Sequence, residues 1–383
     1  MGRHGRPARA GRRPRRRHAL AAPVHRRRGR APAARGQPRA AGGVHRLGLQ
    51  GRQQGRLATG CRRWGSHGCA AEPDRRPDLE HPRVSLEQHP RVWTVLSASR
   101  IGSVHVRDDL PLQDAVLTWS DGSQAVAAVA DGHGHKAHFR SDIGSGLAVV
   151  SAVEELRRVV GTLSDPEEAG DTVTTAAAAI VDSWVTKVRH HIEANPYDVH
   201  DEREAAAVHD PLRPYGTTLL AAAVSGDLLV VLQIGDGDAV LVSDQGEAMR
   251  PLPEDPDLDG LHTSSLCEPQ PLRALRTAVI DTRVEDVALA FLCTDGFGTS
   301  RVDAEGWWRQ TGEQLVEFGR NRGLEWMREQ LPQWLEEPAQ IGGDDTSMVI
   351  IARSDLGAGA HERPFDPDRT DEVPTLADTL DRP

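Results

Sequence analysis

Between residues 114 and 242, short apolar runs alternate with tight-turn signals, and this pattern restricts the possible folds more than any other feature of the sequence. Runs at residues 114–119 and 123–130 flank Asp121-Gly122. Runs at residues 217–224, 228–234 and 239–242 are separated by Ser225-Gly226-Asp227 and Asp236-Gly237-Asp238. Asp and Gly in such short connections favour hairpin turns. The pattern predicts successive antiparallel strands.

Helical patterns accompany these strands. Apolar residues recur at helical spacing over residues 140–160, and residues 176–192 predict a second helix. The Pro-rich, charged residues 195–214 predict a loop. The remaining predicted elements are a loop at 251–260, strands at 278–281, 287–293 and 347–352, and helices within 304–335. Two antiparallel sheets packed as a β-sandwich, with helices outside, would cover every apolar face. We therefore expect an α+β domain of four layers, αββα, over residues 92–353.

The two flanking segments are predicted to be disordered. Residues 1–70 hold 19 Lys and Arg and no Asp or Glu, which leaves 27 basic and 56 acidic residues in the rest of the chain. The Arg/Gly/Pro/Ala-rich segment 1–91 has no apolar periodicity with which to offset the entropy of ordering. Residues 354–383 are acidic and Pro-rich.

Three interpretations of residues 1–91 remain open. The segment is a basic tail for an anionic partner such as a nucleic acid, a tail without a role, or a gene-model artefact of a wrongly assigned start codon. The third fits because out-of-frame GC-rich DNA encodes this composition.

The sequence also bears on cellular location. It contains no run of 18 apolar residues that could span a membrane, and no apolar run follows the Arg cluster as in a secretory signal. Its four cysteines, Cys61, Cys69, Cys267 and Cys293, form no disulfide framework. We expect a cytoplasmic protein with no membrane partner.

Several carboxylates stand where an apolar run meets irregular backbone. They occur in Gln113-Asp114, Asp131-Gly132-His133-Gly134, Asp236-Gly237, Thr294-Asp295-Gly296 and Gly343-Asp344-Asp345. Any one Asp-Gly pair is typical of a turn. As a set at strand ends, these carboxylates would repel one another unless cations lay among them. Oxygen ligands without Cys favour Mg²⁺ or Mn²⁺ over zinc. Two such ions would support attack of an activated water on phosphorus.

The ordered set of motifs resembles the metal-dependent Ser/Thr protein phosphatase family (PPM, type 2C) in its bacterial form. The matching segments span roughly residues 100–352. They are Gln113-Asp114-Ala115, Ala130-Asp131-Gly132-His133-Gly134, Tyr215-Gly216-Thr217-Thr218-Leu219, Ile234-Gly235-Asp236-Gly237-Asp238, Thr294-Asp295-Gly296 and Gly343-Asp344-Asp345-Thr346-Ser347.

The resemblance implies a role for each matching residue. Asp131 would bridge two Mn²⁺ or Mg²⁺ ions, and the Gly132 carbonyl would bind one of them. Asp295 and Asp344 would hold the other ion, and Asp114 would act through a metal-bound water. Asp236 would join a third ion. His133 would be the general acid for the leaving Ser or Thr oxygen.

Two departures from the family pattern concern charge. Gln113 stands where the family often has Glu, which predicts a weaker outer shell for that ion. The arginine that grips the phosphate in many members has no match at its usual spacing. His105 and Arg107 are the two candidates for that role, and the sequence does not choose between them.

The expected function is hydrolysis of phosphoserine and phosphothreonine in proteins by a water that two metal ions activate. The expected partners are a phosphorylated protein substrate and an opposing Ser/Thr kinase, with nucleic acid only if the basic segment is real. The alternatives are a catalytically weak regulatory or binding module on the same fold, and a hydrolase of another phosphoester.

Overall fold

The structure is a computed structural model, and it describes residues 91–253, 255, 263–301 and 306–358. The predictions for residues 1–90 and 359–383 lie outside the described residues, as does most of the predicted loop at 251–260. The chain divides into two units, Met1–Pro82 and Arg83–Pro383, and every described residue belongs to the second.

Ten described strands form two antiparallel sheets of five strands each. The first sheet has the order β1-β10-β9-β6-β7, and the second has the order β2-β3-β4-β5-β8. The strand bounds are β1 Trp93–Arg100, β2 Ala115–Ser120, β3 Gln124–Ala130, β4 Leu219–Ser225, β5 Leu228–Ile234, β6 Asp238–Ser243, β7 Ala248–Met249, β8 Arg276–Asp281, β9 Val287–Cys293 and β10 Thr346–Arg353.

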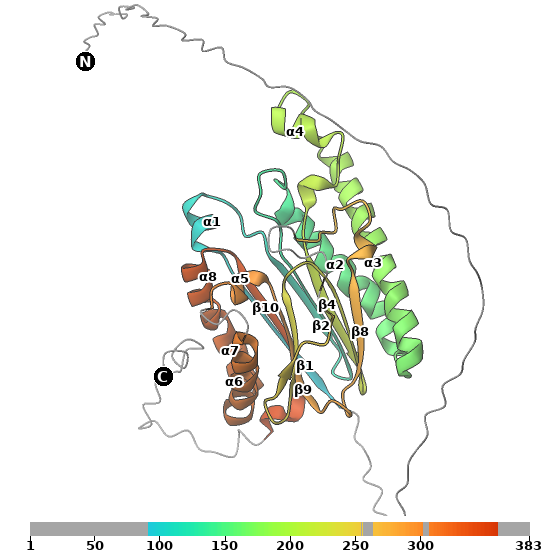
Figure 1. Ribbon diagram of the computed structural model, residues 1–383, viewed down its shortest axis with the longest axis vertical. Coiled ribbons are helices and arrows are strands. Elements are labelled where there is room, and N and C mark those ends of the chain that lie inside the picture. Colours follow the sequence, from blue (N-terminus) through green and yellow to red (C-terminus); the bar gives the residue numbers. More distant parts are fainter. Residues whose placement is uncertain (1–90, 254, 256–262, 302–305, 359–383) are drawn as a thin grey trace, which may run out of the picture. The chain divides into compact units, whose positions relative to one another are not determined.

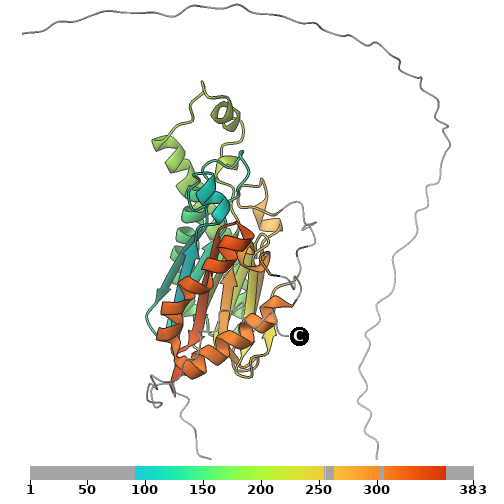
Figure 2. The ribbon, with the colours of Figure 1, turned by 90° about the vertical axis from the view of Figure 1, so that its left-hand side faces the viewer.

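Helices cover the outer faces of both sheets (Figures 1 and 2). Helices α2 and α3 lie on the second sheet, and α6 and α7 lie on the first. The helix bounds are α1 Ser103–Arg107, α2 Ser141–Val159, α3 Pro166–Ala194, α4 Glu202–Ala207, α5 Asp295–Gly298, α6 Trp307–Arg322, α7 Leu324–Trp334 and α8 Glu336–Gly342. The predicted four-layer αββα sandwich is confirmed.

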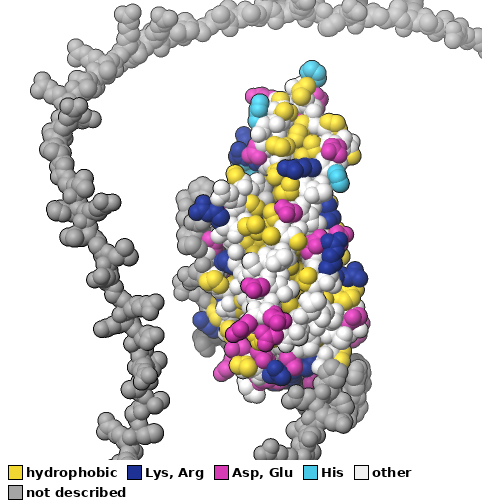
Figure 3. Space-filling view, turned by 90° about the vertical axis from the view of Figure 1, so that its right-hand side faces the viewer, with side chains coloured by type: hydrophobic (Ala, Val, Ile, Leu, Met, Phe, Trp, Pro, Cys, Tyr) yellow, Lys and Arg dark blue, Asp and Glu magenta, His cyan; other side chains and the backbone are white. Residues whose placement is uncertain are grey.

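The burial pattern follows from this layering. In β3 every residue from Ala125 to Ala130 is buried, because α2 covers one face of the strand and the other sheet covers the opposite face. A strand buried on both faces has a continuous apolar sequence instead of an alternating one. On the side of α3, hydrophobic side chains at the surface lie interspersed with acidic and basic ones (Figure 3).

Two predictions about helices were wrong: one placed the start of a helix too late, and the other missed a short helix. The second long helix begins at Pro166, ten residues before the predicted start, because the Asp165 side chain accepts hydrogen bonds from the Glu167 and Glu168 N–H groups. The predicted loop 195–214 contains helix α4, which Asp201 caps in the same way at Arg203 and Glu204. In both segments the apolar periodicity is too weak to predict a helix, and the hydrogen bonds to the capping Asp stabilise its first turn.

Strands β1 and β7 and the short helices α1, α5 and α8 were not predicted from sequence. The alternation of buried and exposed residues in β1 is irregular, which explains why a period of two does not reveal it. None of the described helices combines the length and the apolar composition that crossing a membrane requires.

Candidate metal centre

Strand register brings the predicted acidic segments to one end of the sandwich. Ala115 pairs with Ala130, so Asp114 and Asp131 lie just beyond the same rung of the second sheet. In the first sheet, Cys293 pairs with Met348 on one side and with Asp238 on the other. The segments around residues 236, 295 and 344 therefore also meet at one edge.

Three of the carboxylates form a compact cluster. One oxygen each from Asp131, Asp236 and Asp295 lies within 4.8 Å of the other two. Asp344 lines the same cleft, whose volume is about 790 Å³. Oxygen ligands at this separation suit Mn²⁺ or Mg²⁺. The chemistry of the donor set therefore fits the ions that the sequence predicts.

Two carboxyl groups of this cluster, those of Asp131 and Asp295, have pKa values above the ordinary value for Asp. Burial, and then the charges of Asp114 and Asp295, raise the pKa of Asp131 well above its usual value. Burial and the charge of Asp236 raise the pKa of Asp295 to about 6. The same two causes, burial and neighbouring acids, favour a cation in the cleft, because a cation would relieve both.

Asp114 is not among the residues that line the cleft, and it is 5 % exposed. Its Oδ2 accepts a hydrogen bond from the Thr294 hydroxyl at 2.8 Å, whereas its Oδ1 has no hydrogen-bond partner among the described residues. The neighbouring Gln113 Oε1 is also buried without a described partner. Buried oxygens without partners are costly, so a water or ion in contact with them would stabilise this edge of the cleft.

Gly132 and His133 follow Asp131 on the loop that leaves β3. A Cβ on Gly132 would lie 2.6 Å from the Gln113 carbonyl oxygen, so only glycine fits between the loop and Gln113. The His133 ring packs edge-on against His138, with 4.9 Å between ring centroids. Burial, and then the neighbouring His138, lower the pKa of His133 to about 4. In this structure His133 is therefore neutral at pH 7.

Asp344 and Asp345 are adjacent in sequence but lie in different environments. Asp344 lines the cleft, and burial raises its pKa. Asp345 is 3 % exposed, and its two oxygens accept hydrogen bonds from the backbone N–H groups of Gly102 at 2.7 Å and Gln113 at 2.6 Å. Asp345 therefore joins the chain before β10 to the segments on either side of α1.

The two phosphate-binding candidates on α1 do not line the cleft. His105 is buried, with Nδ1 2.9 Å from Asp345 Oδ2 and Nε2 3.6 Å from Asp344 Oδ1. Arg107 is exposed and pairs with the adjacent Asp108. Among the described residues that line the cleft, the one Lys or Arg is Arg213, at the end of the segment that contains α4.

Sequence reasoning missed three residues of this site: Thr294, Asp345 and Arg213. Thr294 precedes the predicted ligand Asp295, and Asp345 follows the predicted ligand Asp344. Both residues are part of the motifs, but the sequence assigned no role to either. Arg213 carries no sequence signal, because its position beside the cleft depends on how residues 195–214 fold.

Comparison with known proteins places this geometry in a family. Residues 101–336 match the family model described as protein phosphatase 2C, which covers well over half of the chain. The chain belongs to the protein phosphatase 2C family. The resemblance inferred from the motifs is thereby confirmed, although Asp344 and Asp345 lie just beyond the matched residues. A comparison with curated protein sequences gave no match.

Solved structures of similar fold include three bacterial proteins. PppA from Pseudomonas aeruginosa is 16% identical, with a TM-score of 0.45 over 69% of this chain and 99% of that one. PstP/Ppp from Mycobacterium tuberculosis, a serine/threonine phosphatase, is 17% identical, with a TM-score of 0.42 over 69% and 99%. Stp1 from Staphylococcus aureus, also a serine/threonine phosphatase, is 14% identical, with a TM-score of 0.45 over 69% and 98%.

Proposed function

We propose that this member of the protein phosphatase 2C family hydrolyses phosphoserine and phosphothreonine in proteins, with Mn²⁺ or Mg²⁺ bound at the acidic cluster. The observation that carries the proposal is the convergence of the Asp131, Asp236 and Asp295 oxygens within 4.8 Å. Carboxyl groups with raised pKa values in a cleft are typical of a functional site.

Each residue of the cleft has a place in this proposal. Asp131, Asp295 and Asp344 would hold two ions, with the Gly132 carbonyl as a further ligand. Asp236 would contribute to a third ion, and Asp114 would act through water. When bound, these ions would polarise the phosphoryl oxygens and lower the pKa of the attacking water.

The chain's own side chains would do the remaining work. Arg213 would attract the phosphate, since it is the one Lys or Arg among the described residues that line the cleft. His133 is neutral at pH 7 in this structure. A phosphate dianion beside its ring would raise the pKa of His133 and so favour the protonated form that a general acid requires.

Activity of the full chain tests the proposal. We expect release of phosphate from phosphoserine and phosphothreonine peptides that requires Mn²⁺ or Mg²⁺ and stops on addition of a chelator. Cys293 is fully buried in β9, whereas the partly buried Cys267 lines the cleft, so the thiol-blocking reagent is applied to Cys267→Ser, whose turnover it should leave intact. Turnover that survives the chelator but not the thiol reagent would refute the metal-dependent mechanism.

A substrate panel separates the proposed reaction from the alternatives. A nucleotide or a small aryl phosphate hydrolysed far faster than any phosphopeptide would indicate another phosphoester hydrolase. Binding of phosphopeptides without turnover at any metal concentration would indicate a binding module. The partners in this proposal are a phosphorylated protein and the Ser/Thr kinase that phosphorylates it.

A further inference from the structure

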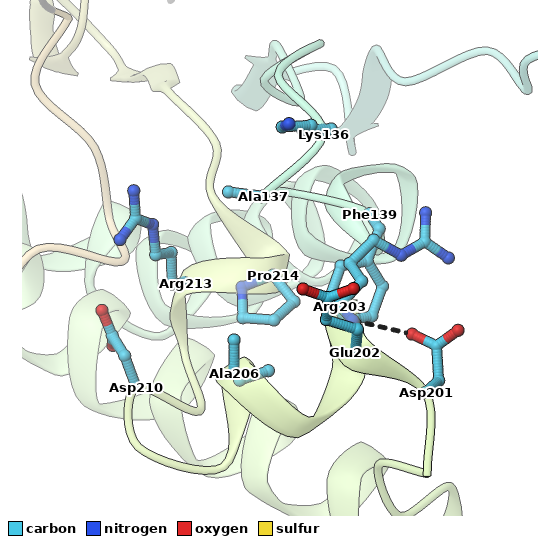
Figure 4. Close-up of a pocket in the computed structure, with 11 residues that line it drawn as sticks. Lys136, Ala137, Phe139, Asp201, Glu202, Arg203, Ala206, Asp210, Arg213 and Pro214 are labelled. Atoms are coloured by element: carbon cyan, nitrogen blue, oxygen red, sulfur yellow. Dashed lines mark hydrogen bonds between the residues drawn. The ribbon is translucent and has the colours of Figure 1, made fainter. Parts of the chain in front are cut away.

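Beside the catalytic cleft lies a second cavity of about 620 Å³, which we call the α4 groove (Figure 4). Its walls are the connection between β3 and α2 on one side and the segment around α4 on the other. Its apolar lining consists of Ala137, Phe139, Ala206, Ala207 and Pro214. A concave site of this size and composition accommodates a large apolar group.

The α4 groove is continuous with the catalytic cleft. Asp210 and Arg213 line both cavities. In Figure 4 these two residues stand at one end of the groove, and Phe139 and Arg203 stand at the other, with Ala206 and Pro214 between them. A ligand whose phosphate lay in the cleft could therefore continue past Arg213 into the groove.

The groove is held in shape by a set of contacts centred on Arg140. The Arg140 guanidinium donates hydrogen bonds to the Asn195 carbonyl at 2.8 Å and to the Tyr215 hydroxyl at 2.9 Å, and it lies over the Tyr197 ring. At the far end, the Arg203 guanidinium lies 4.6 Å from the centroid of the Phe139 ring. Walls ordered in advance reduce the entropy lost when a ligand binds.

The charge of the groove differs from that of the cleft. The charged residues that line the groove are three basic and three acidic: Lys136, Arg203, Arg213, Asp201, Glu202 and Asp210. The described residues that line the cleft instead include six acidic residues and one basic residue, Arg213; the acidic ones are Asp131, Asp210, Asp236, Glu268, Asp295 and Asp344. Because the charges of the groove balance, they give no net preference for a basic or an acidic side chain, and the five apolar residues of the lining favour an apolar one.

We propose that the α4 groove binds an apolar side chain of the phosphoprotein substrate, a short distance along the chain from the phosphoresidue in the cleft. This inference rests on the proposed function. It makes the segment 195–214 a determinant of specificity, because a small phosphoester would fill the cleft alone, whereas a polypeptide would extend beyond Arg213.

The test compares two tryptophan variants of the full chain. Ala206 is an exposed residue of α4 that lines the groove, so Ala206→Trp fills the groove without entering the core. Val208 is 51% exposed just after α4 and does not line the groove, so Val208→Trp is the matched control. The substrates are phosphothreonine peptides with a single Leu placed at each flanking position in turn, the same peptides with Ser there, and an aryl phosphate.

For the wild-type chain we expect one Leu position to raise kcat/KM about tenfold over the Ser peptide, the usual effect of filling an apolar pocket. Ala206→Trp should abolish this preference and lower the ratio of peptide to aryl phosphate kcat/KM about tenfold. Val208→Trp should keep both values. Equal turnover of Leu and Ser peptides, or equal effects of the two variants, would overturn the inference while the proposed function stood.

Peptide binding separates failure of the groove from failure of the proposed function. The Kd of the labelled Leu peptides is measured by fluorescence anisotropy, with the Ser peptides as reference. Preferential binding of a Leu peptide that Ala206→Trp removes would support the groove even if no peptide were hydrolysed. Absence of any Leu preference in binding, with or without hydrolysis, would overturn it.

Discussion

Asp345 Oδ2 accepts a hydrogen bond from the backbone N–H of Gln113 at 2.6 Å, and this contact joins the start of β10 to the residue before Asp114. The two residues precede strands of different sheets: Asp345 directly precedes β10 of the first sheet, and Gln113 leads into β2 of the second. Asp345 thus fixes the relative position of two acidic segments without itself lining the cleft.

Asp345→Asn and Asp344→Asn should therefore fail in different ways. Asn at 345 would replace one of two acceptor oxygens by an N–H donor that faces a backbone N–H, so we expect a loss of about 1–3 kcal/mol of unfolding free energy. Much of the catalytic activity should remain. Asp344→Asn should instead lose activity with no loss of stability. Thermal unfolding and kcat of both variants check this, and equal activity losses would show that the roles of the two residues are misassigned.

Substitution of the clustered carboxylates should separate activity from folding. Asp131→Asn and Asp295→Asn each remove a negative charge that would hold a cation, so we expect kcat to fall about a hundredfold or more. The circular dichroism spectrum should not change. Isothermal titration with Mn²⁺ provides a second measurement, since each variant should bind the ion more weakly. A variant with full activity and unchanged Mn²⁺ affinity would remove its residue from the site.

The raised pKa of Asp295 predicts a pH dependence of stability in metal-free protein. Because the folded-state pKa is about 6 against an ordinary value of 3.8, the contribution of Asp295 to stability is fully present below pH 3.8 and is lost as the pH rises through 6. Metal-free Asp295→Asn should thus match the wild type near pH 4 and exceed its unfolding free energy at pH 7, by on the order of 3 kcal/mol.

This comparison isolates Asp295 from His133, whose lowered pKa has the opposite effect. The His133 pKa of about 4 against 6.5 lowers stability as the pH falls from 6.5 to 4, equally in both proteins. Urea unfolding at several pH values with a chelator present gives the difference directly. A difference that does not grow between pH 4 and pH 7 would contradict the raised pKa.

Arg213 and Arg107 provide a matched pair for the phosphate-binding role. Arg213→Gln should raise KM for a small aryl phosphate about tenfold, because it removes the one Lys or Arg side chain among the described residues that line the cleft. Arg107→Gln should leave KM unchanged, since Arg107 is exposed and paired with Asp108. Steady-state kinetics of both variants decide between them. A raised KM for Arg107→Gln with an unchanged KM for Arg213→Gln would assign phosphate binding to Arg107.

Removal of residues 1–90 should leave both phosphopeptide turnover and the melting temperature nearly unchanged. The segment has no apolar periodicity with which to pack on the domain, and the predicted chemistry begins at Asp114. Any attraction of its 22 Lys and Arg residues to an anionic partner should weaken steeply with salt. An insoluble truncated protein, or one inactive at every salt concentration, would show that the segment is part of the fold.

The sequence by itself determined eight of the ten described strands, the turns between them and the acidic segments of the site. Hairpin turns such as Asp121-Gly122 are local: the Asp121 carboxylate accepts N–H groups of Ser123 and Gln124, and Gly122 adopts φ +96°. The identity of the acidic segments is likewise local, because each stands at the end of an apolar run. These features depend on neighbouring residues, so one sequence was enough to predict them.

The tertiary structure decided which of these residues face the cleft. Asp344 and Asp345 are adjacent and chemically identical, and in the sequence only the family resemblance distinguishes them. In the structure, contacts of Asp345 with Gly102 and Gln113, 243 and 232 positions away, bury Asp345, whereas Asp344 lines the cleft. The same holds for His105, which lies against Asp345, and for Arg213, which reaches the cleft because Arg140 anchors the segment around α4. Contacts between residues so distant along the chain leave no local pattern, and they exist only once both sheets have packed.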